Sequence, residues 1–393
     1  MMLNMGANNP IYYLLFFALA LFVCCLVCHG ELALLRPRIR NLTGYYLTIS
    51  AGGATGGLFV AIVAPALFNA TYELAILLPT TSLMIVICAW RRYYSAQHHW
   101  LRITLFGLVG VFLCIETFYL ARATYLNLAG TEVLARNFYG ALKVRDISGP
   151  TPRDQRRQLL NGAIVHGQQF THPDRRREPT SYYSRSSGIG IVLEELGADG
   201  PLHVGVVGLG IGTVATYGRP GDRYRFYEIN PLVLEIANND FWYMNLNPAN
   251  AEVILGDARL SLERENPQLF DVLAIDAFLG DAIPIHLLTR EAFALYLRHL
   301  KPDGVLAVHV TNQYVDLAPI VGAAAAEFAK AAVVIENEPN IESGAHYSKW
   351  VLMSSRPGFL EATELQMSES LSVPSNLQVW TDDRSDLWRV LRF

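Results

Sequence analysis

The stretch from His203 to Gly218, HVGVVGLGIGTVATYG, decides the fold of the second half of the chain. The small and β-branched apolar residues up to Val207 predict a buried parallel strand. Glycines at alternating positions then predict a tight turn, followed by a helix that begins at about Thr213. A turn of this kind lets a ligand approach the backbone closely. The stretch therefore predicts a nucleotide-binding or nucleoside-binding unit.

Apolar strands and helices continue to alternate after this unit, which predicts a largely parallel, doubly wound sheet of the Rossmann type. Ligands of such sheets bind beyond the carboxyl ends of the strands. The sequence thus predicts an α/β catalytic domain whose site lies where its strands end. The later predicted strands are RYRFYEIN, AEVILGDA, FDVLAIDAF, GVLAVHV, AVVIEN and YSKWVLMSS, and predicted helices lie at 189–196, 231–237 and 289–300.

The 393 residues divide by composition into three parts. Residues 1–121 are predicted to form a transmembrane region. Residues 132–185 are predicted to form a small leading β-sheet, with strands at 138–144 and 158–165. Residues 186–393 are predicted to form the Rossmann-like domain, whose fold resembles that of methyltransferases.

The transmembrane prediction rests on apolar segments of about 18 residues or more that carry almost no charge, which is the length a helix needs to cross a bilayer. Helices of a soluble bundle would carry a polar face, and these segments have none. We therefore expect four spans and a multi-pass protein of the cell's inner membrane, in contact with the lipid bilayer. The glycine-rich run in the second segment leaves a re-entrant path as the alternative. The segments are Ile11–Cys28, Gly44–Phe68, Tyr72–Ala89 and Ile103–Leu120.

Charge and cysteine usage narrow the function classes. The part of the chain after residue 121 has a negative net charge, which argues against a nucleic-acid-binding surface. All five cysteines lie in the apolar segments, where packing explains them. His166 and His286 are expected in loops or pocket walls, because no second ligand follows either at a metal-site spacing. We expect no metal ion.

Acidic residues follow two successive strands after the glycine turn. Glu228 ends the next strand about twenty residues later, where an acid can accept hydrogen bonds from both ribose hydroxyls. Asp257 follows Gly256 at the end of the next predicted strand, AEVILGDA, where it could accept a hydrogen bond from an adenine amino group. Thr213 stands where a dinucleotide-binding pattern has its third glycine. Together these features favour an adenosyl sulfonium ligand over a dinucleotide.

Several motifs together carry a family resemblance. The chain resembles spermidine synthases, and more closely the membrane-fused spermidine-synthase-like proteins of bacteria. The resemblance covers about residues 135–393, and CHGELA, at Cys28–Ala33, resembles the membrane portion of the same fused proteins. The remaining motifs are GLGIGTVA, FYEINPLVLEIA, ILGDAR, FDVLAIDAFLGDAIP, LLNGAIVHGQQF, SYY and WTDDRSDLWRVL.

This resemblance implies transfer of an aminopropyl group from decarboxylated S-adenosylmethionine to an amine such as putrescine. Asp276 stands where the family has the aspartate that deprotonates the amine. Tyr182, or its neighbour Tyr183, matches the tyrosine that helps to orient it. A homodimer formed through the leading sheet is a further implication. The residues implied in binding the adenosyl co-substrate are Gly208, Gly210, Gly212, Glu228, Asp257, Ala258 and Gln168.

The chain departs from the family at two acidic positions. Ile211 stands in the glycine turn where the family has an acid, and Leu279 stands where it has a second aspartate, with Asp281 two residues further on. Both departures weaken the implied recognition of a polyamine. Two other functions therefore stay open: a methyltransferase that uses S-adenosylmethionine, and a non-catalytic sensor or transporter subunit that binds an adenosyl ligand.

Purely structural roles are the alternative for the acids themselves. Asp257 could cap the helix that follows it, and Asp276 could cap the following loop. Asp382 and Asp383 could form a C-terminal cap or a lid over a pocket.

The basic residues of the membrane region conflict with a cytosolic reaction. Arg36, Arg38 and Arg40 lie between the first and second spans, and further arginines lie between the third and fourth. The positive-inside rule places both loops in the cytoplasm, and four complete spans then place the catalytic domain outside. The implied donor and polyamines are cytosolic.

Overall fold

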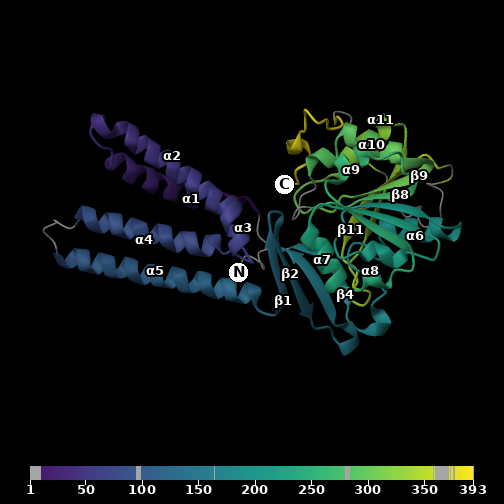
Figure 1. The fold of residues 1–393 in the computed structure, drawn as a ribbon, viewed down its shortest axis with the longest axis horizontal. Coiled ribbons are helices and arrows are strands. Elements are labelled where there is room, and N and C mark those ends of the chain that lie inside the picture. The colour runs from purple at the N-terminus through teal and green to yellow at the C-terminus, as the bar shows by residue number, and fades with distance from the viewer. Residues whose placement is uncertain are drawn as a thin grey trace. The chain divides into compact units, whose positions relative to one another are not determined.

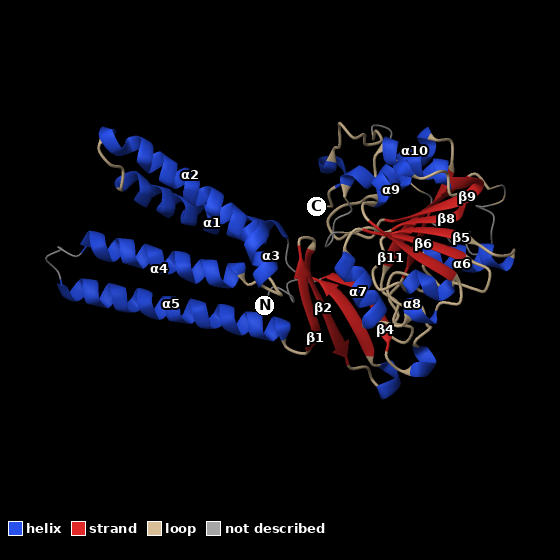
Figure 2. Cartoon of the chain, in the orientation of Figure 1, coloured by secondary structure: helices blue, strands red, loops and turns tan. Residues whose placement is uncertain are grey.

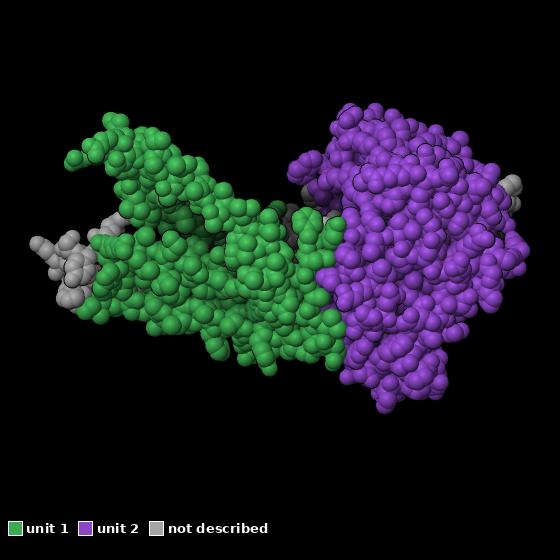
Figure 3. Space-filling model, viewed as in Figure 1, with its two compact units in different colours: residues 1–141 green, residues 142–393 purple. Residues whose placement is uncertain are grey.

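The computed structural model describes residues 10–93, 99–162, 164–278, 284–356, 358, 371, 373–374 and 377–392. The chain forms two compact units, Met1–Ala141 and Leu142–Phe393 (Figure 3).

The first unit consists mainly of helices (Figure 2), and much of their length is apolar. Among its described residues, three segments are long and apolar enough to cross a membrane: Phe17–Leu34, Ile39–Leu67 and Phe106–Leu128. The apolar part of α4, Glu73–Cys88, is shorter and contains Pro79. These three segments leave most of their apolar side chains unburied within the chain, which is unfavourable in water. The helices are α1 (Pro10–Leu34), α2 (Leu42–Leu58), α3 (Ala64–Leu67), α4 (Glu73–Tyr93) and α5 (His99–Leu128).

The second predicted apolar segment is helical throughout. A π-helical turn at Phe59–Val63 connects α2 to α3, and the glycine-rich run lies inside α2. The connection between α1 and α2 lies at the same end of the unit as the C-terminal end of α4 (Figure 1). At the start of α4, Glu73 forms an ion pair of 2.5 Å with Arg136 of strand β1 (Thr131–Asn137).

A four-stranded sheet follows, in the order β1-β2-β3-β4. The sequence predicted two strands here, and that detail is wrong. Phe138 and Tyr139 form a turn between β1 and β2, and Gly162, with φ of +61°, follows β3. The first predicted strand, 138–144, therefore begins in a turn and covers only part of β2, whereas the second, 158–165, runs from β3 across the turn at Gly162 into β4. The remaining strands are β2 (Gly140–Ile147), β3 (Arg156–Asn161) and β4 (Ile164–Phe170).

The second unit contains a seven-stranded sheet in the order β10-β11-β9-β8-β5-β6-β7. Strands β5 to β9 are parallel, and β11 is antiparallel to both of its neighbours, β9 and β10, so the predicted Rossmann-like sheet is confirmed. The strand order reverses between β5 and β8, which is where such sheets bind ligands. The strands are β5 (His203–Val207), β6 (Arg223–Glu228), β7 (Asn250–Leu255), β8 (Phe270–Ile275), β9 (Leu300–His309), β10 (Ala331–Asn337) and β11 (Ser348–Ser354).

Helices cover both faces of this sheet. In Figure 1, α9, α10 and α11 lie on one face, and α6, α7 and α8 lie on the other. The central strands are almost wholly buried between them, which explains their continuous apolar runs. The helices are α6 (Gly188–Ala198), α7 (Pro231–Asn239), α8 (Tyr243–Leu246), α9 (Ala258–Arg264), α10 (Arg290–His299) and α11 (Ala318–Glu327).

The predicted helix after the glycine turn is wrong. Residues Thr213–Tyr217 form a short 3₁₀ helix, and no α-helix follows β5 directly. Its β-branched residues have low helix propensity, and Gly218 with Pro220 ends the segment after little more than one turn.

Candidate functional site

The glycine turn packs closely against the end of β8. Gly208, Gly210 and Gly212 have φ angles of +98°, +53° and +78°, in the left-handed region that favours glycine. A Cβ atom on Gly208 would lie 2.3 Å from the carbonyl oxygen of Asp276. Only glycine can therefore bring the ends of β5 and β8 this close.

Glu228 joins the end of β6 to this turn. One carboxylate oxygen accepts the N–H of Leu209 at 3.0 Å, and the other accepts the N–H of Asn230 at 2.8 Å. Burial raises the pKa of Glu228, and these backbone donors partly offset the rise. Each carboxylate oxygen can accept a further hydrogen bond. The acid is thus held where both oxygens can also accept hydroxyl groups.

Asp257 is the N-cap of α9, as the structural alternative proposed. One of its oxygens accepts the N–H of Leu260 at 2.9 Å, and the other lies 3.5 Å from Nε2 of His286. Ala258 is the first residue of α9, where backbone N–H groups have no partner within the helix. Within the described ranges, no cluster of three or more His, Cys, Asp or Glu residues could hold a metal ion.

Asp276 follows β8 and is buried. Of the two candidate tyrosines, the structure brings Tyr183 to it: the Tyr183 hydroxyl donates to Oδ2 of Asp276. Burial and the Asp276 charge raise the pKa of Tyr183 well above its usual value, so the phenol stays protonated as a donor. The ring of Tyr182 instead lies 5.2 Å from that of His309 and 5.4 Å from that of His346.

His309 completes this cluster, and the sequence analysis missed it. Its Nδ1 lies 2.6 Å from Oδ1 of Asp276, and its Nε2 lies 2.7 Å from the hydroxyl of Thr311. The imidazole is buried and stacks on the indole of Trp350 at 4.6 Å. The signal in the sequence was its position near the end of the predicted strand GVLAVHV, at the same sheet edge as Asp276.

Gln168, which the resemblance implies in binding the co-substrate, is buried in the structure. Its buried amide donates to the carbonyl of Gly344 at 2.7 Å and accepts from Gln158 at 3.1 Å, so it connects β4, β3 and the loop before β11. His166 is the β4 residue beside the turn. A Cβ on Gly210 would lie 2.9 Å from its carbonyl oxygen, and burial lowers its pKa while the Asp276 charge raises it.

The departure at Ile211 places an apolar side chain in the turn. Ile211 is 1% exposed, and a Cβ on Gly167 would lie 2.6 Å from its side chain. Leu279 and Asp281 lie outside the described residues.

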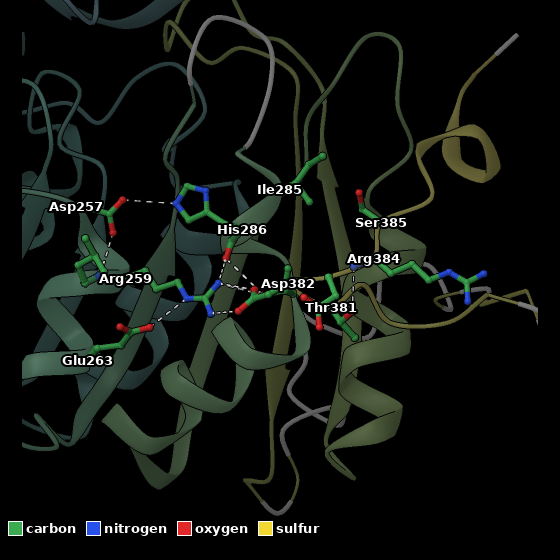
Figure 4. A pocket seen from close by; sticks show the side chains of 12 residues that line it. Asp257, Arg259, Glu263, Ile285, His286, Thr381, Asp382, Arg384 and Ser385 are labelled. Atoms are coloured by element: carbon green, nitrogen blue, oxygen red, sulfur yellow. Dashed lines mark hydrogen bonds and ion pairs between the residues drawn. The ribbon is translucent and has the colours of Figure 1, made fainter.

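A cavity of about 660 Å³ lies beside α9 (Figure 4). Asp382 docks the C-terminal segment here, through hydrogen bonds of 2.7 and 2.5 Å from Arg259 and one of 2.8 Å from Thr289. The Arg259 guanidinium lowers the pKa of Asp382 to about 2. Asp382 therefore acts as a docking residue, and Asp383 lies beside it in the cavity wall.

No family model matches the chain. Over 114 residues it is 33% identical to a polyamine aminopropyltransferase of Vibrio vulnificus (strain CMCP6), a match that covers 28% of this chain and 38% of that protein. The chain is spermidine-synthase-like.

Other similarities extend to methyltransferases. The spermidine-synthase-like chain is 34% identical over 117 residues to an N-terminal histidine N-methyltransferase of Emericella nidulans, a match that covers 28% of the chain and 20% of that enzyme. It thus spans less than two thirds of either relative. A probable spermidine synthase from Corynebacterium glutamicum ATCC 13032 superimposes with a TM-score of 0.47 at 19% identity, over 63% of this chain and 95% of that one.

Proposed function

We propose that the chain is a membrane-anchored aminopropyltransferase that moves an aminopropyl group from decarboxylated S-adenosylmethionine to an amine such as putrescine. The observation that carries this proposal is the buried carboxylate of Asp276, which Tyr183 and His309 hold beside the glycine turn. The sequence similarity to a polyamine aminopropyltransferase supports it.

The residues at the strand ends fit an adenosyl sulfonium. Glu228 has carboxylate oxygens that can accept the ribose hydroxyls, and Asp257 with the N–H of Ala258 can meet the adenine edge. A dinucleotide would place its pyrophosphate at the N-terminus of an α-helix. The 3₁₀ helix at Thr213–Tyr217 offers little of this, which favours a nucleoside over a dinucleotide.

In the proposed chemistry the protein mainly positions the donor and the acceptor amine and supplies one proton acceptor. Asp276 takes a proton from the acceptor ammonium, and Tyr183 holds the carboxylate in place. The neutral amine then attacks the activated carbon, so that one C–N bond forms, one C–S bond breaks and a neutral thioether leaves. Placing the two reactants together and supplying one base are sufficient for such a displacement.

A methyltransferase that uses S-adenosylmethionine is the second candidate. Ile211 supports it, because no acid in the turn is left to meet the free amine of the decarboxylated donor. The similarity to a histidine N-methyltransferase also favours it. A sensor or transporter subunit that binds the same ligand without turnover is the third candidate.

We also propose that the chain crosses the inner membrane four times, through α1, the α2–α3 segment, α4 and α5, and contacts lipid along these helices. The exposed apolar side chains of these helices support this arrangement. The proposed division is 1–121 for the membrane region, 132–185 for the leading sheet region and 186–393 for the catalytic domain. A homodimer through the leading sheet is proposed from the resemblance alone, and light scattering tests it.

One experiment separates the three functions. The full chain in lipid nanodiscs is titrated calorimetrically with decarboxylated S-adenosylmethionine, S-adenosylmethionine and NAD, and then assayed with putrescine. An aminopropyltransferase binds the decarboxylated donor and releases methylthioadenosine, and the Asp276→Asn variant still binds the neutral methylthioadenosine without this turnover. Release of S-adenosylhomocysteine from S-adenosylmethionine with a supplied acceptor would identify a methyltransferase. Binding of NAD in preference to every adenosyl nucleoside would refute the proposal.

A further inference from the structure

A short chain of hydrogen bonds runs inward from Asp276 to the backbone of β11. His309 contacts Asp276 through Nδ1 at 2.6 Å and Thr311 through Nε2 at 2.7 Å. The Thr311 oxygen in turn accepts the backbone N–H of Lys349 at 2.8 Å. The order of donors and acceptors along this chain determines where His309 carries its proton.

The backbone N–H of Lys349 sets the direction, because it can only donate. It occupies one of the two lone pairs of the Thr311 oxygen, and the hydroxyl hydrogen forms a hydrogen bond only where an acceptor lies within reach. Among the described residues, Nε2 of His309 lies at this hydroxyl, and the bond direction that uses the hydroxyl hydrogen makes Nε2 the acceptor. A ring nitrogen that accepts a hydrogen bond carries no proton, so the proton of the neutral imidazole lies on Nδ1 and is donated to Asp276.

We propose that Thr311 holds His309 as a neutral imidazole protonated on Nδ1, so that the pair of Asp276 and His309 keeps a net charge of −1 beside the glycine turn. An imidazolium in the same place would neutralise the carboxylate. His309 is thus a positioning residue, because it is buried and acts on Asp276.

The groups around the pair that belong to the described residues leave this charge uncompensated. Tyr182 and Tyr183 face it from the segment before α6, and Phe278 and Trp350 pack on the imidazole. His166 on β4 lies near Asp276, and burial lowers its pKa, which favours its neutral form at neutral pH. None of these groups contributes a positive charge.

A net negative charge at this point selects for cationic ligands, and this consequence rests on the proposed function. A sulfonium donor and an ammonium acceptor are both cations, whereas the thioether product is neutral at its sulfur. The pair therefore attracts both reactants as they bind, and its charge is neutralised when Asp276 takes the proton of the acceptor ammonium. Buried or partly buried charges exert such effects more strongly than exposed ones.

Nitrogen NMR tests the protonation directly. The full chain, labelled with ¹⁵N at its ten histidines, is placed in nanodiscs at pH 7 without ligand, and the His309→Asn variant identifies the His309 signals. We expect a proton on Nδ1 and an unprotonated Nε2. A proton on Nε2, in the other tautomer or in an imidazolium, overturns the proposal. This measurement requires no ligand and no turnover, so it stands apart from the proposed function.

Ligand preference tests the role of Thr311. The affinity for decarboxylated S-adenosylmethionine is compared with that for neutral methylthioadenosine. In Thr311→Val, Nε2 loses its donor and can take a proton, so the preference for the cation should fall by at least about tenfold. Thr311→Ser keeps the hydroxyl, and His309→Asn keeps an uncharged donor to Asp276, so both should retain the preference.

An unchanged preference in Thr311→Val, with its fold intact by circular dichroism, overturns the role given to Thr311. If the wild-type chain binds neither nucleoside, the proposed function fails instead, and the NMR result still decides the protonation of His309.

Discussion

The carboxylate of Glu228 accepts the backbone N–H of Leu209 at 3.0 Å, so the acid that ends β6 is fixed to the glycine turn that follows β5. Two strand ends are thereby held in one binding surface. A ligand hydroxyl that approaches Glu228 is also brought against the turn.

Glu228→Ala should weaken binding of methylthioadenosine by about 1.5 to 3 kcal/mol, the range for hydrogen bonds to a charged group. Isothermal titration calorimetry of the full chain measures the loss. Glu235, an exposed acid on α7, provides the matched control, and Glu235→Ala should bind normally. A large fall in the melting temperature of ligand-free Glu228→Ala would show instead that the carboxylate mainly stabilises the turn.

Asp276→Asn should retain binding of the neutral nucleoside methylthioadenosine and lose turnover by a factor of roughly 10² to 10⁴, the usual contribution of a positioned base. The amide keeps the shape of the side chain, and the proposed adenosyl contacts lie on other strands. The deficit should shrink as the pH approaches the pKa of the acceptor amine, because the free neutral amine no longer needs a base. Steady-state kinetics from pH 7 to high pH measure this, and full activity at neutral pH would remove the proposed mechanism.

Tyr183→Phe should lower kcat by roughly 10- to 100-fold, because it removes a hydrogen bond to the Asp276 carboxylate worth about 1.5 to 3 kcal/mol. Tyr182→Phe is the matched control and should lower kcat much less, since it is the Tyr183 hydroxyl that donates to Asp276. The same turnover assay compares the two variants. A larger loss in Tyr182→Phe than in Tyr183→Phe would reverse the assignment of the two tyrosines.

Asp382→Asn should lower the free energy of unfolding by about 0.5 to 1 kcal/mol at pH 7, because its half-exposed ion pair with Arg259 is screened by solvent. The pKa of Asp382 is lowered in the folded chain to about 2 from 3.8. Its contribution is therefore fully present above pH 3.8 and is lost as the pH falls through about 2. Urea unfolding at pH 7 and at low pH measures the difference, with Asp383→Asn as the control. A deficit that persists unchanged at low pH would exclude the charge as its cause.

A reporter fused to the C-terminus tests the membrane topology. Four complete spans with Arg36, Arg38 and Arg40 in the cytoplasm place the C-terminus outside the cytoplasm. A fused alkaline phosphatase should then be active, and a fused green fluorescent protein should not fluoresce. The triple variant R36E/R38E/R40E should weaken this preference for one orientation, because the loop loses its positive charge. A fluorescent fusion of the natural sequence would place the catalytic domain with the cytosolic donor and would rule out the four-span arrangement with these arginines inside.

The sequence by itself determined the Rossmann-like sheet and the acids at its edge. Hydrophobic periodicity reports which residues are buried, and in a parallel sheet every strand ends at the same edge. Glu228 and Asp276 could therefore be assigned to one site before the structure was known. The positive-φ turn at Gly208 was equally predictable, because only glycine adopts this backbone freely.

Tertiary structure alone decided which side chains meet. His309 lies 33 residues after Asp276 and reaches it because β9 pairs with β8, with Ile275 opposite Val308. Local periodicity contains no information on which strands become neighbours or in which register they pair. For the same reason the sequence could not decide between Tyr182 and Tyr183. The side chains of two adjacent tyrosines differ in the direction in which they point, and the packing of the segment before α6 against distant strands sets that direction.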